Sequence, residues 1–103
     1  MSSFSDLINK SEVPVLVDFY ADWCGPCKYM SPVLKSVADK LEDKLKVVKV
    51  DVDKNQRAAQ VYQVQGIPTM ILFYKGEVLW RQSGAMPEQL LLQHLTPHLT
   101  AKV

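Results

Sequence analysis

Residues 13–20 constrain the fold more than any other part of the chain. They read V-P-V-L-V-D-F-Y, so apolar side chains, many of them β-branched or aromatic, fall on both alternating faces. Such a run predicts a β-strand that is covered on both sides and therefore lies at the centre of a sheet. Beyond it, apolar residues recur at steps of three and four and predict an amphipathic helix of about 16 residues. The apolar stripe of this helix consists of Met30, Leu34, Val37 and Leu41.

The following segments complete a βαβ unit. Residues 46–52 alternate in apolar character and predict a second strand, which is parallel to the first because a helix connects the two. Asn55 is a candidate N-cap for a short helix over residues 56–62.

A hairpin is predicted next. Gly66-Ile67-Pro68 breaks the chain before a strand at residues 69–74, and the tight turn at Lys75-Gly76 joins this strand to an antiparallel one at 77–82. The predicted sheet is therefore mixed, with parallel and antiparallel pairs.

Prolines interrupt two of the predicted helices. Pro32 lies inside the apolar stripe, and because the stripe continues past it we expect a kink near Pro32 rather than a helix end. Pro87 opens a last helix that carries Leu91 and Leu95, and Pro97 should end or bend this helix.

Length and charge narrow the class of protein. With 103 residues, we expect one domain, residues 1–103, with a single compact architecture. Twelve basic residues against 11 acidic ones give no sign of binding to nucleic acid or to an anionic membrane. No segment resembles a secretory signal or a membrane span, so we expect a cytoplasmic protein.

The two cysteines of the chain lie three residues apart in Trp23-Cys24-Gly25-Pro26-Cys27, at the junction of the first strand and the first long helix. Residues at this helical spacing have Cβ atoms ~5–6 Å apart, and a disulfide requires Cα atoms ~4.4–6.8 Å apart. A disulfide here would close a very short loop and stabilise the fold little. In a reducing compartment it is more typical of a transient, catalytic bond. We therefore expect a redox switch.

The two thiols should differ. Cys24 falls at the helix start, where free N–H groups and the positive end of the helix dipole favour its thiolate. Cys27 lies one turn further in, and we expect it to be more buried and less acidic. Pro26 suits the first helical turn, and Gly25 leaves the sulfur of Cys24 accessible.

Half of a zinc site is the alternative interpretation of the cysteine pair. His94-x-x-x-His98 has the spacing of a second half. However, many more residues separate Cys27 from His94 than the ~12–15 of a zinc finger. We rank this alternative low and expect no metal.

Asp18 is a carboxylate inside the most apolar strand, where its neighbours predict burial. Lys49, in the adjacent predicted strand, is the nearest candidate partner. The pair is either a buried structural ion pair or a catalytic one. In the second case, burial would raise the pKa of Asp18 and let it exchange a proton with Cys27. We favour the catalytic interpretation.

These motifs together resemble the thioredoxin family. The resemblance rests on V-L-V-D-F-Y-A-D-W-C-G-P-C-K at residues 15–28, on G-I-P-T at 66–69 and on S-G-A at 83–85, and it spans nearly the whole chain. It implies a three-layer α/β/α sandwich around a mixed sheet. The family usually has one more strand before its first helix, and Phe4 already aligns within that helix. We therefore expect four strands, with the strand around Val48 at an exposed edge guarded by Lys46.

The resemblance also implies a function, that of a general protein-disulfide reductase. Cys24 would attack a disulfide in a client protein and Cys27 would resolve the mixed disulfide. A thioredoxin reductase would then restore the dithiol with NADPH. The chain itself would need no cofactor beyond the Cys24–Cys27 disulfide, and we expect it to act as a monomer.

A client-binding rim is implied as well. Pro68 matches a family proline that follows a cis peptide bond and faces the cysteines. The residues that match the rim are Trp23, Gly25, Pro26, Ile67, Pro68, Gly84 and Ala85. Without the resemblance, Gly84 and Ala85 would be read as a simple turn. Tyr20 stands where many members of the family have tryptophan, which adds a hydroxyl group beside the site.

Two other classes of function remain open. A specialised oxidant or isomerase could use the same fold, although Gly25-Pro26 between the cysteines resembles the reducing members. A non-catalytic binding module could keep the fold and use the cysteine pair for a metal or a scaffold.

Overall fold

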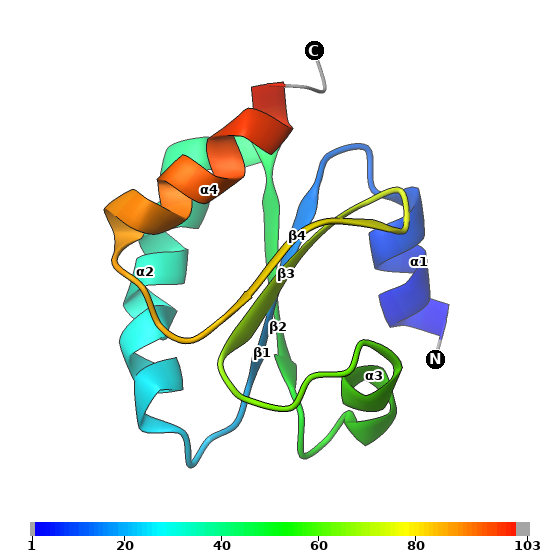
Figure 1. Ribbon diagram of the computed structural model, residues 1–103. Helices are drawn as coiled ribbons and strands as arrows, with labels where there is room; N and C mark the ends of the chain where they lie inside the picture. Colours follow the sequence, from blue (N-terminus) through cyan, green and yellow to red (C-terminus); the bar gives the residue numbers. More distant parts are fainter. Residues whose placement is uncertain (1, 101–103) are drawn as a thin grey trace.

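The computed structural model describes residues 2–100 as four helices packed on a four-stranded sheet (Figure 1). Along the chain the elements are α1 (Ser2–Lys10), β1 (Val15–Tyr20), α2 (Gly25–Leu41), a 3₁₀ turn η1 (Glu42–Lys44), β2 (Lys46–Asp51), α3 (Gln56–Val61), β3 (Thr69–Tyr74), β4 (Glu77–Ser83) and α4 (Glu88–Thr100). The helices α2 and α4 cover one face of the sheet, and α1 and α3 cover the other (Figure 1). The expected three-layer α/β/α sandwich is confirmed.

The strand order in the sheet is β2-β1-β3-β4. β1 pairs parallel with β2 and antiparallel with β3, and β3 pairs antiparallel with β4, so the sheet is mixed as predicted. β1 and β3 lie at the centre and are almost fully buried. β2 is an edge strand, as expected, and Lys46 is exposed on it.

Two hydrophobic clusters lie between the layers, one on each face of the sheet. The cluster under α2 and α4 contains Leu16, Met30, Leu34, Val37, Leu72, Leu91 and Leu95, so the predicted stripe of the long helix faces the sheet. The cluster under α1 and α3 contains Ile8, Val15, Val17, Phe19, Ile71 and Phe73. The rings of Phe4, Tyr62 and Phe73 extend this second cluster through edge-to-face contacts.

The local predictions hold for most elements and differ from the structure mainly at the element ends. The long helix continues through Pro32, as expected. Pro97 does not end α4, which continues to Thr100 because Leu95 and Leu99, on both sides of the proline, pack against the core. Asn55 does not cap α3 with its side chain. Its Nδ2 instead donates to the carbonyl oxygen of Asp51 at 3.0 Å. The short helix also ends one residue earlier, at Val61.

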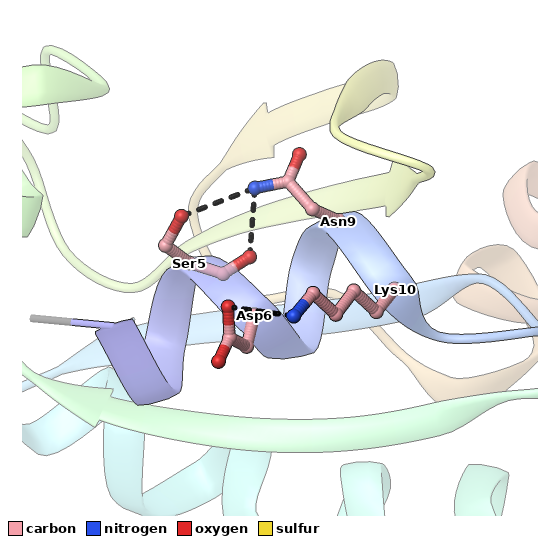
Figure 2. A network of polar contacts seen from close by, with 4 residues as sticks. All are labelled: Ser5, Asp6, Asn9 and Lys10. Atoms are coloured by element: carbon pink, nitrogen blue, oxygen red, sulfur yellow. Dashed lines mark hydrogen bonds and ion pairs between the residues drawn. The ribbon is translucent and has the colours of Figure 1, made fainter.

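α1 is fixed to the turn between β3 and β4. The amide of Gly76 donates to the carbonyl oxygen of Ile8 at 2.8 Å, and Asn9 lies so close that a Cβ on Gly76 would come within 2.2 Å of its Oδ1. The Asn9 side chain is itself held by Ser5, since its Nδ2 donates to the backbone oxygen at 2.7 Å and to Oγ at 3.1 Å (Figure 2). The positive φ of 86° at Gly76 further favours glycine there.

Candidate functional site

Cys24 and Cys27 form a disulfide at the start of α2, with a Cα–Cα distance of 5.3 Å. Cys24 is the N-cap residue of α2, and its Sγ accepts a hydrogen bond from the amide of Cys27 at 3.2 Å. An N-cap position has extended backbone and a side chain that meets the free amides of the first turn. The sulfur of Cys24 therefore occupies the place where a helix favours a negative charge.

In this disulfide form the two cysteines are buried to nearly the same extent. Cys24 is 4% exposed and Cys27 3% exposed. The disulfide ties both sulfurs to the first turn, where Ala21 is buried with them and Ile67 packs against the group. The asymmetry lies instead in the contacts, because only Cys24 occupies the N-cap and approaches the loop before β3.

That loop carries the cis peptide bond between Ile67 and Pro68 that the resemblance implied. The carbonyl oxygen of Ile67 lies 3.8 Å from the Sγ of Cys24. The carbonyl oxygen of Pro68 accepts from the amide of Gly84 at 2.8 Å, and Gly84 has a φ of 96°, so a glycine suits this turn. The loop before β3 and the turn after β4 thus lie together beside the disulfide.

Most of the expected rim is open to solvent. Trp23 is 69% exposed, and its Nε1 donates to Asp53 at 2.8 Å. The other exposed members are Gly25, Pro26, Gly84 and Ala85, and Ile67 is half-buried. Pro68 differs from the rest because it is buried. It can therefore offer little side-chain surface to a client.

Asp18 is fully buried, with 0% of its surface exposed, as predicted. It lies on the sheet face covered by α2, since its neighbour Leu16 packs there and strand side chains alternate. Neither carboxylate oxygen has a hydrogen-bond partner among residues 2–100. Burial raises the pKa of Asp18 to about 6, and the positive charge of Lys49 opposes part of that rise.

Lys49 stands opposite Asp18 in the register of β1 and β2, but it does not form the direct ion pair that we expected. Its Nζ donates to the Oγ of Ser31 at 3.1 Å and lies 4.6 Å from the centre of the Tyr20 ring. The ammonium group is exposed and is held on the helix side of the strand edge, so the carboxylate stays without a contact partner. Tyr20 supplies a cation–π contact here.

A small pocket of about 180 Å³ connects this region with the disulfide. It is lined by Cys27 and Lys49 together with Tyr20, Ala21, Asp22, Lys28 and Ser31. Cys27 and Lys49 therefore line the same pocket, although Cys27 itself is buried.

The zinc arrangement is not formed. Within residues 2–100 no group of three or more His, Cys, Asp and Glu side chains is placed to hold a metal ion. His94 stacks on the ring of Trp80 at 5.2 Å, so it forms part of the packing between α4 and β4.

Two contacts of the site were missed by the sequence reasoning. Ser31 holds Lys49, and its position one helical turn after Cys27 would have pointed to it. Arg81 of β4 donates to the carbonyl oxygens of Tyr62 and, at 2.7 Å, of Gln63. It therefore fixes the segment that leads from α3 to the cis-proline loop. No sequence signal distinguishes Arg81 from any other arginine on an edge strand.

The comparisons with known proteins agree with this geometry. The family model named Thioredoxin matches residues 1–97. Thioredoxin Y, chloroplastic, of Oryza sativa subsp. japonica is 51% identical over 94 residues, which are 91% of this chain and 56% of that protein. Thioredoxin 1 of Chlorobaculum tepidum is 48% identical over 93 residues, covering 90% of this chain and 92% of the relative. The thioredoxin of Haemophilus influenzae is 39% identical over 98 residues, with 95% and 92% covered.

The Oryza sativa relative and two Arabidopsis thaliana relatives, Thioredoxin Y1 and Thioredoxin Y2, are chloroplastic by name, and the chain spans little more than half of the length of each. The cytoplasmic location therefore stays a prediction. No helix among the described residues has the length and apolar character needed to cross a membrane. With a family match over nearly its whole length, this chain belongs to the thioredoxin family.

Proposed function

We propose that this protein is a general protein-disulfide reductase in which Cys24 is the nucleophile and Cys27 the resolving thiol. The observation that carries the proposal is the position of Cys24 at the N-cap of α2, where its sulfur accepts from the amide of Cys27 at 3.2 Å. That environment stabilises a thiolate, which is the attacking form in disulfide exchange.

The reaction requires two exchanges. In the first, the Cys24 thiolate attacks one sulfur of a client disulfide, the client S–S bond breaks, and the released client thiolate takes up a proton. A bond now joins Cys24 to the client. In the second, the Cys27 thiolate attacks the Sγ of Cys24, and the second client thiolate leaves. The client gains two electrons and two protons, and the Cys24–Cys27 disulfide closes.

Asp18 is proposed as the group that receives the proton of Cys27 before the second exchange. Its burial on the α2 face and its pKa of about 6 support this role, because a base works best when its pKa lies near the working pH. Lys49, which lines the pocket beside Cys27, is proposed to limit the rise of that pKa. The same groups would return the proton when the disulfide is reduced again.

Client docking is proposed at the rim beside Cys24. The carbonyl oxygen of Ile67, 3.8 Å from the sulfur, can accept a backbone hydrogen bond from an extended client segment. The exposed ring of Trp23, the helix start at Gly25 and Pro26, and the turn at Gly84 and Ala85 would supply apolar contact. Pro68 would act through its backbone, since its ring is buried.

A coupled assay tests the proposal. Insulin, NADPH and a thioredoxin reductase are mixed with the protein, and NADPH loss is followed at pH 7. We expect turnover that requires both cysteines. Failure to reduce insulin even with dithiothreitol present would leave a binding module as the better interpretation, and a redox titration that placed the pair among strong oxidants would assign an oxidase or isomerase instead.

A further inference from the structure

A second surface of the molecule has the form of a binding site. Beside the edge strand β2 lies a groove of about 560 Å³, within the size range of ligand sites. Its apolar wall comes from α1, β2, α3 and the residue that follows α3, and it is formed by Phe4, Val50, Ala58, Val61 and Tyr62. Val61 is among the most exposed large apolar residues of the described chain, at 60%.

The backbone of β2 is open along this groove. The amide of Lys46 donates to Pro14 and that of Val52 donates to Tyr20, so the even-numbered residues of this segment point their amides toward β1. Because strand residues alternate, the amide groups of Val47 and Lys49 point to the open side. β2 is the last strand on that side of the sheet. Such an edge can pair with one more extended segment.

The charge around the groove is positive. Lys49, Lys54 and Arg57 line it, and no acidic residue does. Neither Lys54 nor Arg57 forms an ion pair within residues 2–100. The two nearby acids are turned elsewhere, since Asp51 accepts from backbone amides and Asp53 accepts from the Trp23 indole.

We propose that the edge of β2 and this groove form a docking site for an acidic, extended segment of a partner protein. The open amides favour a strand, and the apolar wall favours apolar side chains at alternate positions. The two cations whose charged groups are not held elsewhere, Lys54 and Arg57, favour carboxylates, because the ammonium group of Lys49 is held on Ser31. A second copy of this chain fits poorly, because pairing β2 with itself would bring its lysines, Lys46 and Lys49, close to those of the other copy.

The groove lies next to the redox site but is separate from it. Lys49 lines both this groove and the pocket that contains Cys27. A partner held on β2 would therefore lie close to the disulfide, which would raise its effective concentration there. The proposal does not depend on the chemistry of the cysteines.

The test is a titration of the ¹⁵N-labelled, oxidised full chain with the peptide acetyl-Glu-Val-Glu-Phe-Glu-Val-Glu-amide. A second peptide carries lysine in place of each glutamate. We expect the acidic peptide to shift the amide signals of Val47, Lys49 and α3, and the basic peptide to leave them unchanged. Lys54→Glu combined with Arg57→Glu should weaken binding about tenfold, since two favourable charge pairs become repulsive.

The control is Lys35→Glu, on the exposed side of α2, which is compared with Lys54→Glu alone so that the two changes of charge are equal. It should leave binding unchanged, and the Lys54/Arg57 variant should keep its insulin-reducing activity. The proposal is overturned if Lys35→Glu weakens binding as much, if the shifts cluster at Cys24 and Ile67, or if neither peptide shifts β2 at millimolar concentration. Concentration-dependent dimers with protected β2 amides would assign the edge to a second copy instead.

Discussion

Replacing Asp18 with asparagine should stabilise the protein at neutral pH and remove a large pH dependence of its stability. The carboxylate is fully buried and has no hydrogen-bond partner among the described residues. Burial raises its pKa from 3.8 to about 6. The charged form is therefore less stable in the folded chain than in the unfolded one.

The sign and the size of the effect follow from proton linkage. Between pH 4 and pH 6 the folded chain keeps a proton on Asp18 that the unfolded chain has already lost, so the free energy of unfolding falls as the pH rises. A difference of about two pKa units at ~1.4 kcal/mol each gives a loss of about 3 kcal/mol by pH 7. Asparagine cannot ionise and does not incur this loss.

Urea denaturation of the oxidised protein between pH 4 and pH 8 measures the effect. The difference in unfolding free energy between Asp18→Asn and the unchanged protein should grow by about 2.5 kcal/mol from pH 4 to pH 7, because a small part of the loss has already occurred at pH 4. An unsatisfied buried amide also costs stability, but that cost does not vary with pH and cancels in the comparison. Asp39→Asn, at an exposed aspartate of α2, is the control and should show no such growth. Parallel pH profiles for the unchanged protein and Asp18→Asn would refute the reasoning.

Three further predictions concern the disulfide, the loop beside it and the turn under α1. Cys27→Ser should trap client proteins on Cys24 as covalent adducts that a reductant releases, and Cys24→Ser should lose turnover. If gels of clients incubated with Cys27→Ser show no such adducts, Cys27 does not act as the resolving thiol. Pro68→Ala should raise the KM for insulin while changing the melting temperature little. An unchanged KM with full stability would contradict a docking role. Gly76→Ala should lower the free energy of unfolding by about 1–2 kcal/mol, because the φ of 86° at this position and the contact with Asn9 both disfavour a Cβ atom. The cost should shrink in an Asn9→Ala background, and an equal cost in both backgrounds would rule out the contact.

The order of the helices and strands was predictable because each one is indicated by a local sequence pattern. The β3–β4 hairpin follows from apolar runs on either side of Lys75-Gly76, and the parallel pairing of β1 and β2 follows from the helix between them. Helix ends were less predictable. Asn55 has a side chain suited to an N-cap, but the turn after β2 gives its amide a backbone oxygen of Asp51, and only the folded turn decides between the two.

Residue positions in the candidate site were predictable where they follow from the secondary structure. The contacts of long, flexible side chains were not. The apolar residues on both faces of β1 placed Asp18 in the interior, and the junction of strand and helix placed Cys24 at the helix start. The contact partner of Lys49 was not predictable from register. A lysine side chain is long and flexible and can reach several neighbours. In this fold, Ser31 and the Tyr20 ring hold the ammonium group of Lys49.

Because Lys49 contacts Ser31 and Tyr20 and not Asp18, the energetic cost of burying the Asp18 carboxylate is poorly compensated. A direct ion pair would lower the pKa of Asp18 and recover part of the lost stability, but it would also leave the carboxylate ionised at every physiological pH. With its Nζ on Ser31 and over Tyr20, Lys49 still opposes the rise of the pKa without abolishing it. The carboxyl group then stays close to the balance between its two protonation states, which is what the proposed exchange of a proton with Cys27 requires. Tyr20 contributes to this balance, because its ring face holds the ammonium group of Lys49 at 4.6 Å from the ring centre.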